Sequence, residues 1–193
     1  MHHIYHTEGI ILGSKNVGES DKYYYIFTRD LGMVYASAGG VRKMSSKLRF
    51  ILQDFSYVKL DIVQGKNIFR ITSASKANIL RDITKRIETY RIIVNISRLL
   101  RRLLAGVEPN QALFADLVHS FSVLEKIKSK EDLFNTEAII VLRILNNLGY
   151  IGENVILENL VKSPFEEGIL FEASKSRSHI LTQINKALKE TQL

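Results

Sequence analysis

The sequence has 193 residues, with 27 Lys and Arg side chains against 20 Asp and Glu, so its formal net charge is +7. It contains no cysteine, which excludes disulfides, cysteine-ligated zinc, iron–sulfur clusters and a thiol nucleophile. No apolar stretch is long enough to form a membrane-spanning helix, and the polar residues 1–9 do not resemble a signal peptide. We therefore expect a folded cytoplasmic protein.

The charge is unevenly distributed along the chain. Residues 1–102 carry a net charge of +10, whereas residues 103–193 carry −3. A cationic front half favours a polyanionic partner such as nucleic acid. The alternative is that these side chains are ordinary solvated surface charges.

The first 77 residues predict a small β-barrel. Val58, Leu60 and Ile62 alternate with polar residues, which indicates a strand with one buried face. A short helix capped by serine is expected at residues 45–53. Five short strands joined by turns, with one inserted helix, are typical of a closed barrel. The five runs rich in β-branched and aromatic residues are 7–15, 22–29, 33–38, 55–64 and 68–73.

The remainder of the chain predicts helices. Residues 150–172 are less regular, because Pro164 and Gly168 interrupt the pattern. Period two gives way to period 3.6 near residues 73–77, which divides the chain into domains 1–77 and 78–193. Apolar residues recur at helical spacing in four segments, 78–104, 110–127, 130–148 and 175–193.

Several short motifs do not by themselves indicate a binding or catalytic site. Residues 13–20 mimic a phosphate-binding loop, but Glu19 stands where that motif needs a lysine, so we expect a turn between strands. His2, His3 and His6 could bind a metal, the alternative being a mobile terminus. Neither His119 nor His179 has a partner at a spacing that indicates a catalytic triad.

A run of aromatic residues at 23–27 could offer stacking faces for nucleic-acid bases. Alternation along a strand places Tyr23, Tyr25 and Phe27 on one face and Tyr24 and Ile26 on the other. At least one of these two sets belongs to the core.

Two sets of basic residues are candidates for phosphate binding. In the first, two glycines precede cations interleaved with serines, which can bind phosphates by charge and hydrogen bonds or can form an exposed, solvated loop. In the second, spacings of seven and four residues place three arginines on one side of a helix. The sets are Arg42, Lys43, Lys47 and Arg49, and Arg91, Arg98 and Arg102.

Four blocks, in this order and spacing, resemble the N-terminal domain of the RecO family. The blocks are residues 12–21 (LGSKNVGESD), 27–32 (FTRDLG), 38–48 (AGGVRKMSSKL) and 52–55 (LQDF), and residues 138–150 (AIIVLRILNNLGY) add a looser match. The resemblance implies an α+β fold, with an N-terminal five-stranded OB-type β-barrel followed by an all-α helical domain. It also implies that the first basic set, Arg42 to Arg49, binds DNA.

The resemblance further implies a bacterial recombination mediator that is not an enzyme and needs no cofactor. Such a protein binds single- and double-stranded DNA, anneals strands, and acts with a RecR-type protein and the C-terminal tail of single-stranded-DNA-binding protein to load RecA, at the nucleoid. Many members carry a four-cysteine zinc module after the last matched helix. Residues 151–171 lack cysteine, so we expect a reduced, metal-free loop there and a C-terminal helix at 175–193.

Two other functions are alternatives to that of a recombination mediator. The chain could be a protein-interaction adaptor that binds the acidic tail of single-stranded-DNA-binding protein in a helical groove and binds DNA only weakly. A hydrolase or nuclease is disfavoured, because the sequence shows no carboxylate cluster for two-metal catalysis.

Overall fold

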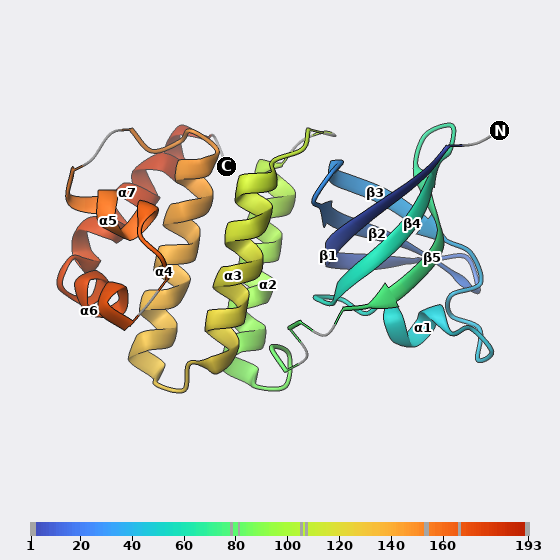
Figure 1. Cartoon of the computed structure of the whole chain (residues 1–193), viewed down its shortest axis with the longest axis horizontal. Helices are drawn as coiled ribbons and strands as arrows, with labels where there is room; N and C mark the ends of the chain where they lie inside the picture. The colour runs from blue at the N-terminus through green and yellow to red at the C-terminus, as the bar shows by residue number, and fades with distance from the viewer. Residues whose placement is uncertain are drawn as a thin grey trace.

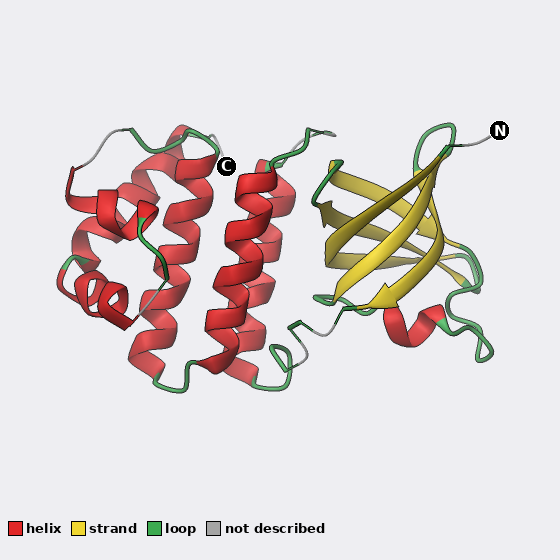
Figure 2. Cartoon of the chain, in the orientation of Figure 1, coloured by secondary structure: helices red, strands yellow, loops and turns green. Residues whose placement is uncertain are grey.

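The structure is a computed structural model that describes residues 3–77, 79–80, 82–104, 106, 108–152, 155–165 and 167–191. An N-terminal barrel lies beside a helical body (Figures 1 and 2). The strands are β1 (Ile4–Val17), β2 (Asp21–Thr28), β3 (Gly32–Ala38), β4 (Tyr57–Gln64) and β5 (Phe69–Lys76). The described helices are α1 (Leu48–Ile51), α2 (Ile87–Leu103), α3 (Gln111–Lys126), α4 (Lys130–Asn147), α5 (Val155–Lys162), α6 (Glu167–Lys175) and α7 (Arg177–Glu190).

The five strands close into a barrel in the order β1-β2-β3-β5-β4. All neighbours are antiparallel except β3 and β5, which pair in parallel and close the barrel. Alternate residues fill the interior, and Val58, Leu60 and Ile62 are buried as their spacing predicts. The predicted closed barrel is confirmed. Of the segment 13–20, for which a turn was expected, residues 18–20 form the turn between two strands, whereas residues 13–17 belong to β1.

The helix inserted after β3 differs from its prediction. α1 has only four residues, and Lys47 precedes it without a side-chain cap. Val41 and Leu52 on either side of the segment are both buried in the barrel core. The chain between these two anchors turns repeatedly, with Lys43 N–H bonded to the Gly40 carbonyl, which leaves room for one helical turn.

The long helix expected at 78–104 begins at Ile87 instead. Leu80 has a φ of 61°, a left-handed conformation that interrupts a helix. Leu80 and Ile83 are both buried in the core shared by barrel and helices. Their apolar periodicity therefore reflects a connection that packs inward rather than extra helical turns. Residues 78 and 81 lie outside the described part.

Residues 150–172 are also more regular than expected, because α5 and α6 occupy most of them. Pro164 lies between these two helices, and Gly168 lies in the first turn of α6, where few intrahelical bonds exist to lose. The helices form because their apolar side chains can be buried against α4. Leu157, Leu160, Phe165, Ile169 and Ala173 are all buried.

One hydrophobic cluster runs from the outer wall of the barrel into the helices. Phe27 of β2 and Tyr57 of β4 both contact Phe114 of α3, with ring centroids 5.6 and 6.1 Å apart. Gly32 has a φ of 67°, and a Cβ added there would overlap the backbone of Glu108. The strand-to-helix change thus falls between residues 76 and 87, but the core does not stop there. The division into domains at residue 77 stays a prediction.

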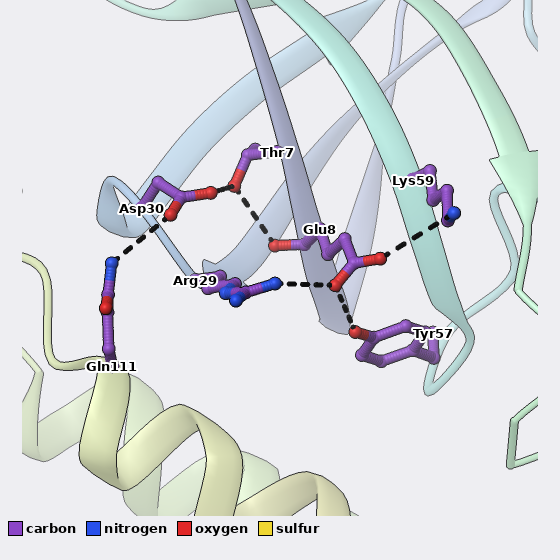
Figure 3. Close-up of polar contacts among 7 residues, drawn as sticks. All are labelled: Thr7, Glu8, Arg29, Asp30, Tyr57, Lys59 and Gln111. Carbon is purple, nitrogen blue, oxygen red and sulfur yellow. Dashed lines mark hydrogen bonds and ion pairs between the residues drawn. The ribbon is translucent and has the colours of Figure 1, made fainter.

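A network of polar contacts lies on the barrel beside the same junction, and one of them crosses it (Figure 3). Asp30, in the β2–β3 turn, accepts hydrogen bonds from the Thr7 hydroxyl at 2.8 Å and from Gln111 of α3 at 3.4 Å. Beside it, Glu8 accepts a hydrogen bond from the Tyr57 hydroxyl at 2.8 Å. Within the barrel these contacts join β1 to β4 and to the β2–β3 turn, and the bond from Gln111 joins that turn to α3.

Candidate nucleic-acid interface

A cationic loop follows β3 on the side of the barrel away from the helices (Figure 1). The loop is anchored by Val41, whose side chain is buried in the barrel core. It also bonds to the β1–β2 turn, because the Arg42 N–H donates to the Ser20 carbonyl at 2.8 Å and the Arg42 guanidinium donates to the Gly18 carbonyl at 3.1 Å. The loop is therefore held in place although its charged side chains face solvent.

Asp21 is the second anchor of this loop. Its carboxylate accepts hydrogen bonds from Gly40 N–H at 2.7 Å and from the Ser20 hydroxyl at 3.0 Å. These bonds, with a smaller contribution from the charge of Lys43, lower the pKa of Asp21 below its ordinary value. Asp21 therefore stays ionised at neutral pH and keeps the loop docked on the β1–β2 turn.

The basic side chains of the loop and of α1 are exposed. In the described part of the chain, none of them forms an ion pair with a carboxylate. The exposed apolar side chains of Met44 and Phe50 lie beside Arg49, whose guanidinium is 2.8 Å from the Met44 sulfur and 5.9 Å from the Phe50 ring centre. Four of the predicted residues are thus gathered here, and they are Arg42, Lys43, Lys47 and Arg49.

The three predicted arginines of α2 lie elsewhere. Arg91, Arg98 and Arg102 are exposed on one side of α2, as their spacing predicts. Arg98 and Arg102 line a groove of about 400 Å³ between α2, α4 and α7. The structure therefore places the seven predicted residues on two separate surfaces, one on the barrel and one on the helical body.

Aromatic side chains gather on the outer face of β2 and β3. The rings of Tyr23 and Tyr25 both contact Tyr35, with centroids 5.3 and 4.9 Å apart, and all three rings are partly exposed. Burial, followed by the neighbouring Tyr25 and Tyr23 hydroxyls, raises the pKa of Tyr35. Arg101 of α2 lies over the Tyr25 ring at 3.9 Å.

Sequence reasoning placed Tyr23, Tyr25 and Phe27 on one face, and the structure places them there. Phe27 is buried under α3, and Tyr24 and Ile26 fill the barrel interior. Tyr35 and Arg101 were missed. Alternation within residues 33–38 could have placed Tyr35 on the outer face. Nothing local predicts Arg101, because only the packing of α2 on the barrel brings it there.

The described histidines near the N-terminus, His3 and His6, do not lie together in a metal-binding cluster. His6 lies in β1, so it is not part of a mobile terminus, and its ring nitrogen is 2.7 Å from an Asp61 oxygen. His3 packs edge-on against Tyr5, and residue 2 lies outside the described part. Within the described ranges, no three His, Cys, Asp or Glu side chains are close enough to hold a metal ion, and no helix is long and apolar enough to cross a bilayer.

Curated relatives share similarity with most of the chain. The DNA repair protein RecO of Caldanaerobacter subterraneus subsp. tengcongensis is 24% identical over 95% of this chain and 72% of its own length. The RecO proteins of Rubrobacter xylanophilus and Desulfitobacterium hafniense are 29% and 26% identical over 76% and 86% of this chain. The matches cover 58% and 63% of those two relatives, so the chain spans only part of their length.

A closed five-stranded barrel with an inserted helix and a helical body defines an OB-type barrel protein, a class that includes many nucleic-acid-binding proteins. Residues 1–79 match the family model described as "Recombination protein O N terminal". These residues therefore match the N-terminal domain of the RecO family of DNA repair proteins, and the relatives extend the similarity into the helical body.

Proposed function

We propose that this chain is a non-catalytic DNA-binding protein of recombinational repair. In this proposal it binds single- and double-stranded DNA, anneals complementary strands and helps to load the recombinase RecA on single-stranded DNA. It acts at the nucleoid with a RecR-type protein and single-stranded-DNA-binding protein. It makes and breaks no covalent bond.

The observation that carries the proposal is the anchored cationic loop on the OB-type barrel. Arg42, Lys43, Lys47 and Arg49 point four exposed positive charges into solvent without carboxylate partners in the described structure. When such side chains bind phosphates, they displace the counterions condensed on the nucleic acid, which favours binding without regard to sequence. Two strands on one cationic surface repel each other less, which favours annealing.

The first test measures the affinity for single-stranded DNA as a function of salt. We expect affinity to fall steeply with salt, and the combined change of Arg42, Lys43, Lys47 and Arg49 to Ala to reduce the slope by about 3, because each lost phosphate contact contributes about 0.7. The control changes Lys126, Lys128, Lys130 and Lys189 to Ala, which removes equal charge from the helical body. If both variants changed the salt dependence of DNA affinity equally, the loop would not be a specific part of the DNA-binding site.

The second test follows annealing of labelled complementary strands, with and without single-stranded-DNA-binding protein. The wild-type chain should accelerate annealing, and the loop variant should lose most of that acceleration. No acceleration by the wild-type chain at low salt would refute the annealing role.

A second candidate function is that of an adaptor, which the groove between α2, α4 and α7 favours. Its apolar walls include Leu99, Val141 and Leu181, and Arg98 and Arg102 line it as well. Apolar walls with cations beside them suit an acidic peptide such as the tail of single-stranded-DNA-binding protein.

The two functions of the groove arginines can be separated with Arg98→Ala/Arg102→Ala. If the groove binds an acidic tail, this variant should lose a labelled acidic peptide in an anisotropy assay and keep its DNA affinity. If these arginines bind DNA instead, the variant should lose DNA affinity, and neither the wild-type chain nor the variant should bind the peptide.

A further inference from the structure

Strand register places two rows of side chains across the outer face of β1, β2, β3 and β5. In the first row, Lys15 lies opposite Tyr23, Tyr23 opposite Ser37, and Ser37 beside Arg70. The second row lies two residues along each strand, about 7 Å away. The first row thus has a central aromatic ring and a polar side chain, with a cation at each end.

The second row brings Tyr25 of β2 opposite both Gly13 of β1 and Tyr35 of β3. Gly13 lies beside a β-bulge and has a φ of 147°, and an added Cβ would be 3.2 Å from an Arg101 nitrogen. The absence of a side chain at Gly13 therefore gives Arg101 its access to the Tyr25 ring. The second row therefore runs from the Arg101 guanidinium over the Tyr25 ring to the Tyr35 ring, whose plane is tilted by 38° from that of Tyr25.

A groove borders the first row where the β4–β5 hairpin overhangs it. Its volume is about 570 Å³, and Tyr23, Ser37, Lys66, Asn67 and Arg70 are among its lining residues. Lys66 and Arg70 are exposed and have no ion-pair partner within the described ranges. The groove therefore combines an aromatic ring, amide and hydroxyl groups, and uncompensated positive charge.

We propose that Tyr23, Tyr35 and Tyr25 form a stacking platform for the unpaired bases of single-stranded nucleic acid. The backbone would follow the cations on either side, namely Lys15, Lys66, Arg70 and Arg101. This inference rests on the proposed DNA-binding function and adds to it a surface that distinguishes single strands from duplexes.

The chemistry of the platform differs from that of the cationic loop. Bases in a duplex are already stacked on each other and cannot reach a protein ring, whereas the bases of a single strand can. Aromatic rings stack on any base, because every base has a π-face. The loop binds phosphates of either form. β3 connects the two surfaces, since it carries Tyr35 and Ser37 and leads directly into the loop after Ala38.

The test compares oligothymidine of about 16 nucleotides, the upper end of the site size of one such barrel, with an abasic oligomer of equal length and charge. Wild-type protein should bind oligothymidine more tightly. Tyr23→Leu/Tyr35→Leu should weaken oligothymidine binding tenfold or more and leave abasic binding unchanged. Tyr23→Phe/Tyr35→Phe should retain wild-type binding, because phenylalanine preserves the rings. This second variant also shows that the outer face tolerates substitution.

Tyr150→Leu, which changes an exposed tyrosine three residues after α4, is the control and should bind both oligomers normally. The platform is refuted if wild-type protein binds both oligomers equally, or if the leucine variant weakens both equally. Absence of any binding at low salt would instead overturn the proposed DNA-binding function. A 5-iodouracil oligomer that crosslinks to peptides other than those containing Tyr23, Tyr25 or Tyr35 would also contradict the platform.

Discussion

Tyr24 shows how the barrel interior limits a single side chain. It is fully buried, and its hydroxyl has no hydrogen-bond partner among the described residues. A buried hydroxyl without a partner loses its bonds to water and gains none in return. The buried ring of Tyr24 stabilises the folded state, whereas its unpaired hydroxyl destabilises it.

The change Tyr24→Phe should therefore raise the free energy of unfolding by about 1 kcal/mol. Chemical denaturation monitored by circular dichroism measures this change. Tyr57→Phe is the matched control, because the Tyr57 hydroxyl donates to Glu8 at 2.8 Å. The free energy of unfolding of that variant should fall by about 1.5 kcal/mol or more, since the acceptor of the lost hydrogen bond is a carboxylate. Destabilisation by both variants would contradict the argument for Tyr24.

Tyr24 also predicts a response to alkaline pH. Burial, with a smaller effect from the charge of Asp54, raises its pKa from 10 to about 12. The folded state thus resists ionisation that the unfolded chain accepts, so stability falls as pH rises from about 10 to about 12. Tyr57, whose pKa is also raised by burial and by Glu8, should contribute to the same loss. Tyr24→Phe should reduce the pH dependence, and an unchanged dependence would contradict this assignment.

Site residues were predictable where their role is local. The exposure of Arg42 and Lys43 follows from glycine and serine neighbours that favour a loop. Arg101 was not predictable, because its partner Tyr25 is distant in sequence and depends on the bulge at Gly13. A stacking surface assembled from strands and a helix requires the tertiary structure.

At the scale of the elements, one buried arginine organises the cysteine-free segment after α4. Arg143 is 3% exposed, and its guanidinium donates to the carbonyls of Leu160 at 2.9 Å and Ser163 at 2.6 Å. It also pairs with Asp116 of α3 at 3.0 Å and lies 5.0 Å from the Phe165 ring centre. These contacts cap the end of α5 and position the start of the connection to α6.

Arg143→Met should lower the free energy of unfolding by about 3 kcal/mol, because it leaves the Asp116 charge and two carbonyls without their partner. Hydrogen exchange should rise most in residues 157–165. The control is Lys162→Met, which breaks the exposed pair with Glu158 at 2.7 Å and should cost about 0.5 kcal/mol or less. Equal losses in the two variants would show that Arg143 does not organise this segment.

The elements themselves were predicted to different extents. β2, β3 and α4 were predicted within two residues, because alternation, helical periodicity and a glycine or serine at the boundary agree there. The start of α2 was missed because Leu80 and Ile83 repeat at helical spacing while packing in a non-helical connection. α5 and α6 were missed because Pro164 separates two helices rather than marking a loop.

At the scale of the whole molecule, the shared core predicts that barrel and helical body unfold together. Phe114 is central to this coupling, since it is 4% exposed and contacts Phe27 and Tyr57 across the junction. The overlap that any side chain at Gly32 would make with the Glu108 backbone shows how closely the two parts approach. Separate domains would instead be connected by a less apolar interface.

The two parts can be monitored independently in the wild-type chain. It has no tryptophan, and six of its eight tyrosines lie in residues 1–77, so tyrosine fluorescence reports mainly on the barrel and far-ultraviolet circular dichroism on the helices. We expect both signals to share one denaturation midpoint. Phe114→Ala should lower the free energy of unfolding by about 3–5 kcal/mol, and both signals should report the same loss. Phe171→Ala, at a side chain 64% exposed, should change the free energy of unfolding by about 0.5 kcal/mol or less. Barrel fluorescence that persists after the helices unfold would show two separate domains, and the cationic loop and stacking platform would then be available to DNA without the helical body.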